Sequence, residues 1–156
     1  MYMKLTIQQA MTRRGNIEAE INNIFEAIYR AYGVVSLDGK DVVSEVTAKQ
    51  FEDNVNRLNE LAEENAVLAD KIQEANVNTL LDGKSVTYWL NYLKKKRNLI
   101  RMLNRDRTSG VVSGVGFVEN DYVVRDIAVK ERELEGYCNG ISERIDQLNS
   151  EVTIEI

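Results

Sequence analysis

The chain has 156 residues, of which 44% are apolar and 29% are charged, and its formal net charge is -5. These values are typical of a single globular domain and exclude a disordered chain. Because there is one cysteine and no histidine, the composition excludes Ser-His and Cys-His nucleophiles, the usual zinc and di-iron ligand sets, and an intramolecular disulfide.

No stretch approaches the roughly 20 consecutive apolar residues that span a bilayer, and the first residues lack the apolar segment of a signal peptide. We therefore expect a cytoplasmic protein without a membrane partner. The absence of proline leaves long helices uninterrupted, so turns must rely on Gly, Asn and Asp.

The first predicted helix covers about residues 5–32. Its apolar residues recur three and four positions apart, the spacing that places side chains on one helix face. They are Ala10, Ile17, Ile21, Ile24, Ile28 and Ala31, and Gly33 ends the pattern. Residues 34–43, VVSLDGKDVV, then place an Asp-Gly pair between two β-branched runs, which predicts a small β-hairpin.

The second predicted helix, about residues 47–80, keeps its apolar pattern over about 32 residues, or roughly 48 Å at 1.5 Å per residue. Its seam contains Phe51, Val55, Leu58, Ala62, Ala69 and Ile72, and Leu61 and Leu68 widen the stripe. Asn65 and Asn76 lie on the same seam, where a buried Asn typically fixes register or oligomeric state. This length predicts a long antiparallel, coiled-coil-like helical hairpin.

Residues 83–85, Gly-Lys-Ser, look like the end of a phosphate-binding loop. Such a loop needs a glycine at position 78, where this chain has asparagine. We instead expect Asp82 and Gly83 to form a tight corner between two antiparallel helices, and Ser85 to cap the next helix. That third helix, about residues 85–107, carries Val86, Trp89, Leu90, Leu93, Ile100 and Leu103.

The fourth predicted helix covers about residues 127–153. Its apolar residues are spaced 4, 3, 4, 3 and 4 positions apart, and they are Leu134, Cys138, Ile141, Ile145, Leu148 and Val152. This spacing predicts that Cys138 is a buried apolar residue and not a nucleophile. The preceding residues 108–125 are rich in Gly and Val and are compatible with a second β-hairpin or a loop.

Residues 72–90, IQEANVNTLLDGKSVTYWL, resemble the septicolysin-like family of small bacterial helical proteins. The matching positions are Ile72, Asn76, Asn78, Thr79, Asp82, Gly83, Ser85, Thr87 and Leu90. The order of the helices fits over most of the chain, but Leu93-Lys94 stands where the family commonly has Arg-Asp, and TIEI replaces a C-terminal tryptophan. The resemblance implies an all-helical, oligomeric protein and indicates no activity.

Residues 94–107, KKKRNLIRMLNRDR, have seven basic residues and one acid, so this segment is +6 and the rest of the chain is -11. Lys94, Arg97, Arg101 and Arg105 follow one helical stripe that could track a phosphate backbone. Alternatively, these basic side chains pair with acids on a neighbouring helix or subunit, namely Glu60, Glu63, Glu64 or Glu74. The acidic remainder of the chain would repel nucleic acid and therefore favours this alternative.

Two pairs of acids at helical spacing raise one enzyme hypothesis. Glu60 with Glu63, and Glu143 with Asp146, could hold Mg²⁺ in an all-α nucleotide pyrophosphatase, although exposed helix faces often contain such pairs. Outside this alternative we expect no cofactor.

Together these patterns predict an all-α fold in one domain, with a long antiparallel hairpin, two further helices and one or two small β-hairpins in the connections. Helical seams too long for one small core would leave apolar patches exposed. We therefore expect a non-enzymatic protein that forms a homo-oligomer, a dimer or larger, or binds a protein partner. The alternatives are nucleic-acid binding and the magnesium enzyme.

Overall fold

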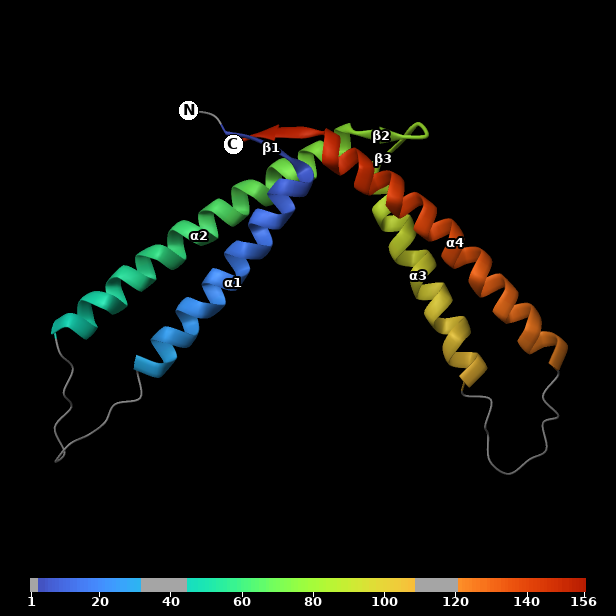
Figure 1. The fold of residues 1–156 in the computed structure, drawn as a ribbon, viewed down its shortest axis with the longest axis horizontal. Coiled ribbons are helices and arrows are strands. Elements are labelled where there is room, and N and C mark those ends of the chain that lie inside the picture. The colour runs from blue at the N-terminus through green and yellow to red at the C-terminus, as the bar shows by residue number, and fades with distance from the viewer. Residues whose placement is uncertain (1–2, 32–44, 109–120) are drawn as a thin grey trace, which may run out of the picture. The chain divides into compact units, whose positions relative to one another are not determined.

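The computed structural model describes residues 3–31, 45–108 and 121–156. Within them the predicted all-α architecture is confirmed (Figure 1). Four helices, α1 (Ile7–Ala31), α2 (Glu45–Asn78), α3 (Val86–Thr108) and α4 (Asp121–Glu151), make two antiparallel pairs, α1 with α2 and α3 with α4. The hairpin predicted at 34–43 and the central part of 108–125 lie outside the described residues.

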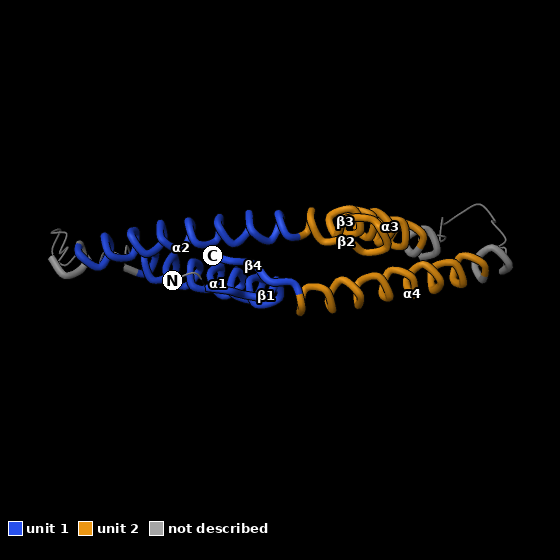
Figure 2. The backbone as a smooth tube through the Cα atoms, turned by 90° about the horizontal axis from the view of Figure 1, so that it is seen from above, with its two compact units in different colours: residues 1–75, 152–156 blue, residues 76–151 orange. Residues whose placement is uncertain are grey.

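Four short strands form two small antiparallel sheets. Strand β1 (Lys4–Thr6) pairs with β4 (Thr153–Glu155), and β2 (Leu80–Leu81) pairs with β3 (Lys84–Ser85). The contacts divide the chain into two compact units, shown in different colours in Figure 2. Unit 1 contains residues 1–75 and 152–156, and unit 2 contains residues 76–151.

Unit 1 begins and ends with its sheet. Leu5 pairs with Ile154 in the β1–β4 register, and further backbone hydrogen bonds join Met3 to Ile156. Helix α1 then starts in a capping box, because the Thr6 N–H donates to Gln9 Oε1 at 2.9 Å and the Gln9 N–H donates to Thr6 Oγ1 at 3.1 Å. The sheet thus ties together the two ends of the described chain.

The core of unit 1 lies between α1, α2 and β4. Its buried residues are Ile7, Ala10, Ile17, Leu61, Leu68, Ile72 and Ile154. The predicted seam of α2 is wrong at Ala62, which is exposed, whereas Leu61 and Leu68, predicted to widen the stripe, are fully buried. Burying a leucine removes more apolar surface from water than burying an alanine, so α2 is rotated toward its leucines.

Ion pairs beside this core fix the register of the α1–α2 hairpin. Arg13 donates to both carboxylate oxygens of Glu64, at 2.6 and 2.8 Å, and Arg57 donates to Glu20 at 2.9 Å. The hydrogen bond from Arg13 holds the pKa of the Glu64 carboxyl below its ordinary value.

The core of unit 2 is a second apolar seam, between α3 and α4. The buried residues of α3 are spaced seven positions apart, and the whole set comprises Leu81, Val86, Leu93, Ile100, Cys138, Ile141 and Ile145. Leu90, predicted on this seam, is instead 45% exposed. Cys138 is 1% exposed, in agreement with its predicted burial.

Candidate functional site on the α3–α4 hairpin

The Asp82-Gly83 turn sets where α3 begins. Both residues have positive φ, 51° and 74°, as a type I′ turn requires, and the turn joins β2 to β3. The sequence predicted a corner at these residues but not the two short strands beside it. Ser85 then caps α3, because its Oγ accepts a hydrogen bond from the Tyr88 N–H at 3.2 Å.

An exposed ion pair connects this turn to α4. Arg144 donates two hydrogen bonds to the Asp82 carboxylate, at 2.7 and 2.6 Å. These hydrogen bonds hold the pKa of Asp82 below its ordinary value and raise the pKa of Arg144. The negative charge of Asp82 is therefore matched by a cation on the neighbouring helix.

A ladder of lysines and tyrosines follows the turn along α3. Tyr88, Tyr92 and Lys96 follow one another at intervals of four residues along α3, so each lies about one helical turn from the next. Lys84 of β3 precedes Tyr88 by four residues. The tyrosine rings are stacked with centroids 6.2 Å apart and planes inclined by 17°. Lys84 Nζ lies 5.6 Å from the Tyr88 ring centroid, and Lys96 Nζ lies 5.3 Å from that of Tyr92. We call these four residues the Lys-Tyr ladder.

Two further aromatic side chains support the ladder. Trp89 packs edge-on against Tyr88 and Tyr92, with centroids 5.3 and 5.7 Å away, and its Nε1–H donates to the Leu81 carbonyl at 2.7 Å. Tyr137 of α4 lies 6.3 Å from Tyr92 in an edge-to-face arrangement. Tyr88 and Tyr137 remain 45% and 50% exposed, so the cluster presents aromatic surface to solvent.

The basic side chains of the predicted stripe are exposed to solvent where the structure describes them. Lys94, Arg97 and Arg101 are exposed on α3, and the side chain of Arg105 lies outside the described part of the structure. Arg97 donates to Ser142 Oγ at 2.6 Å and Arg101 donates to Asn98. Of the acids expected as partners, Glu60, Glu64 and Glu74 pair with cations of unit 1, namely Arg57, Arg13 and Lys71.

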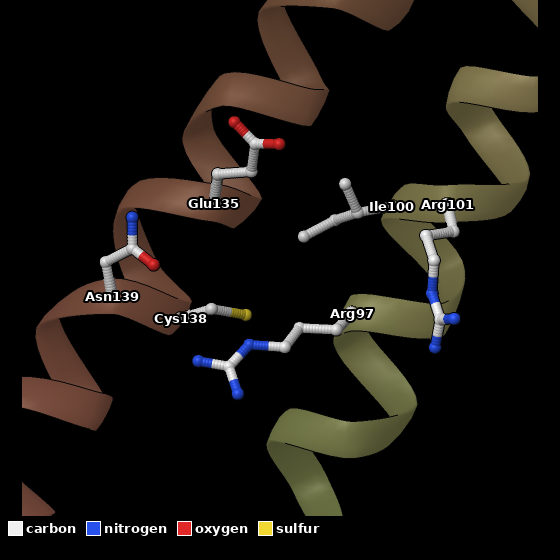
Figure 3. Close-up of a pocket in the computed structure, with 6 residues that line it drawn as sticks. All are labelled: Arg97, Ile100, Arg101, Glu135, Cys138 and Asn139. Atoms are coloured by element: carbon white, nitrogen blue, oxygen red, sulfur yellow. The ribbon is translucent and has the colours of Figure 1, made fainter.

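Arg97 and Arg101 line an open groove of about 560 Å³. Ile100 of α3 and Cys138 of α4 contribute its apolar lining, and Glu135 and Asn139 complete its α4 side (Figure 3). The Arg97 guanidinium extends toward α4 (Figure 3). Because Glu135 places a carboxylate in the same groove, an anionic ligand would meet one repulsive charge there.

The residues predicted to hold magnesium fall into different units. Glu60 and Glu63 belong to unit 1 and Glu143 and Asp146 to unit 2, and Arg57 donates to Glu60 at 3.1 Å. Among the described residues, no three acidic, histidine or cysteine side chains are grouped so that they could hold a metal ion.

The two seam asparagines have different environments. Asn65 Oδ1 accepts a hydrogen bond from Arg14 Nε at 2.8 Å, which joins α2 to α1. Asn76 Oδ1 is buried and has no hydrogen-bond partner within the residues that the structure describes. The first asparagine therefore contributes to the pairing of the two helices inside one chain.

The Lys-Tyr ladder was not predicted from the sequence, although the four-residue spacing of its members is visible there. Its four members mix charged and aromatic residues, so the stripe belongs neither to an apolar pattern nor to a basic one. Comparisons with family models, curated proteins and solved structures found no match for this chain. None of the described helices is long and apolar enough to span a membrane.

Proposed function

We propose that the protein is a non-enzymatic assembly module that forms a homo-oligomer through the open half of unit 1, residues 21–30 of α1 and 49–58 of α2. The observation that carries this proposal is the incomplete burial of the apolar seam there. Ile17 and Leu61 are fully buried, but Phe25 and Tyr29 are 57% and 85% exposed.

Two helices alone cannot enclose the seam in this half. The residues that continue it, Ile21, Ile24, Ile28, Val55 and Leu58, are all only partly buried. In a helical bundle, a second pair of helices covers such residues. Another copy of this hairpin would supply an apolar stripe of the same length and chemistry, which is the requirement for a two-fold symmetric interface.

Charge favours α1 as the self-associating helix. It has three basic and three acidic residues and therefore no net charge, so two copies can approach without overall repulsion. Helix α2 has three basic and eight acidic residues, and two α2 faces would repel each other. An interface centred on α1, with Phe25 in contact between copies, meets both constraints.

Membership of the septicolysin-like family is part of the same proposal, supported by the resemblance at residues 72–90. That resemblance implies an oligomeric helical protein, which agrees with an interface on α1. The family resemblance indicates no reaction, and the described residues provide no grouped metal ligands.

Sedimentation equilibrium over a concentration series tests the proposal directly. We expect a mass of two or more chains at micromolar concentration and reversible dissociation on dilution. A mass of 17.8 kDa, the single chain, throughout the series would contradict self-association.

A further inference from the structure

We propose that the Lys-Tyr ladder, with Tyr137 beside it, binds single-stranded nucleic acid. In this arrangement nucleobases stack on the tyrosine rings and the lysine ammonium groups contact the phosphates. The ladder lies in unit 2, whereas the self-association surface lies in unit 1, so this inference does not rest on the proposed oligomer.

The geometry of the two tyrosines suits stacked bases. Their rings are nearly parallel, and their centroids are 6.2 Å apart. Tyr88 is 45% exposed, so solvent reaches its ring and an arriving base can stack on the exposed face.

The lysines place positive charge at the two ends of the tyrosine pair. Lys84 lies over Tyr88 and Lys96 lies over Tyr92. An exposed cation–π contact is weak, so an arriving base can displace the ammonium group from the ring face. The released ammonium group remains within reach of the phosphate next to that base. Aromatic rings combined with such cations are the usual means of binding single strands without sequence preference.

Two acids that are close in sequence to members of this site, Asp82 before Lys84 and Glu133 before Tyr137, are paired with cations. Asp82 is held by Arg144 through two hydrogen bonds, and Glu133 pairs with Lys130 at 2.7 Å. The ladder is also part of an excess of positive charge, because α3 has seven basic residues and one acidic residue. A polyanion approaching α3 therefore meets net attraction even though the whole chain is acidic.

This site differs from the phosphate-binding stripe that the sequence indicated. Arg97 and Arg101 line the groove with Glu135, whereas Tyr92 contacts Tyr137 on the other flank of the seam. The ladder has aromatic faces, and the groove has none among its lining residues. Stacking accordingly selects an unpaired strand, because the bases of a duplex are stacked on one another and cannot lie on the rings.

The test uses the full chain with twelve-nucleotide oligo(dT) and oligo(U) at low salt. Trp89 is the only tryptophan and contacts both ladder tyrosines, so its fluorescence reports binding directly. Anisotropy of labelled oligonucleotides gives the dissociation constant. We expect saturable quenching with either strand, and binding in the micromolar range that is typical of contacts without sequence specificity.

Variants separate stacking from charge. Tyr88→Leu should weaken binding on the order of tenfold, because one stacked base is lost, whereas Tyr88→Phe keeps the ring and should bind like the natural chain. Met11→Leu, at an exposed apolar residue of unit 1 outside the proposed self-association surface, is the control and should have no effect. Lys84→Gln with Lys96→Gln should reduce the slope of log K against log salt by about 1.4.

Three results would overturn the proposal. One is equal affinity for a duplex or for inorganic polyphosphate, which would indicate charge attraction alone. The second is unchanged binding by Tyr88→Leu when circular dichroism shows it to be folded. The third is no binding of either oligonucleotide, which would leave the ladder to a partner of another class, such as an acidic protein. If Tyr88→Leu does not fold, the salt slope of the double lysine variant decides.

Discussion

Replacing Phe25 by alanine should dissociate the proposed oligomer. The ring is 57% exposed in the single chain, which leaves about 115 Å² of a side chain whose full area is about 200 Å². At about 25 cal/mol per Å², covering that surface contributes up to about 2.9 kcal/mol per chain. We take about 2 kcal/mol, because the alanine methyl group and incomplete covering each reduce the loss. In a two-fold dimer the loss counts twice, so the dissociation constant should rise roughly 1,000-fold.

Sedimentation equilibrium of the natural chain and of Phe25→Ala measures both dissociation constants. Met102→Ala is the matched control, because Met102 is 64% exposed on α3 in unit 2 and should leave self-association unchanged. Circular dichroism should show the same helix content in all three proteins, since Phe25 contributes little to the core of its own chain. The reasoning is refuted if Phe25→Ala associates as tightly as the natural chain, or if Met102→Ala dissociates it equally.

Three further predictions concern the stability of the single chain. Leu68→Ala should lower the free energy of unfolding by about 2–5 kcal/mol. Ala62→Gln, at an exposed position, should change it by less than about 0.5 kcal/mol. Urea titration measures both, and a larger loss of stability in Ala62→Gln than in Leu68→Ala would contradict the observed rotation of α2. Cys138→Ser should cost about 1–3 kcal/mol, because a hydroxyl enters an apolar core, and the native thiol should react with Ellman's reagent only on unfolding. Because the pKa of Asp82 is depressed by Arg144, the pair stabilises the fold above the ordinary Asp pKa and loses this effect as the pH falls through the depressed value. Asp82→Asn should therefore melt below the natural chain at pH 7, and the two should melt alike in strong acid.

Helical periodicity predicted most of the fold. The seam of α4 agrees with its prediction at Cys138, Ile141 and Ile145, because large apolar residues occupy nearly every seam position there. In α2, alanines and leucines lie side by side in the sequence, and spacing alone did not show which of them face α1. Leu61 and Leu68 have more apolar area to bury than the neighbouring alanines, and this difference in burial energy sets the rotation of α2. The spacing of apolar residues does not contain that information.

The β1–β4 sheet was not predicted from the sequence. Each strand has three residues, too few for a local alternation to be recognised, and the partners are far apart in the chain. The Asp82–Arg144 ion pair was also not predicted, because sequence spacing does not show which acid reaches Arg144. The turn between β2 and β3 brings the Asp82 carboxylate to α4. The corner residues were predictable because Asp-Gly and a following serine have strong local preferences.

The pairing of β1 with β4 has a consequence for how the chain acquires its structure during synthesis. Unit 2 is continuous in sequence, so all of its residues leave the ribosome before β4 does. Strand β1 therefore has no pairing partner while unit 2 is being translated. Ile154 of β4 is needed both to complete the sheet and to fill the core beside Ile7. The α3–α4 pair is thus free to fold first, and unit 1 is completed only after β4 has been translated.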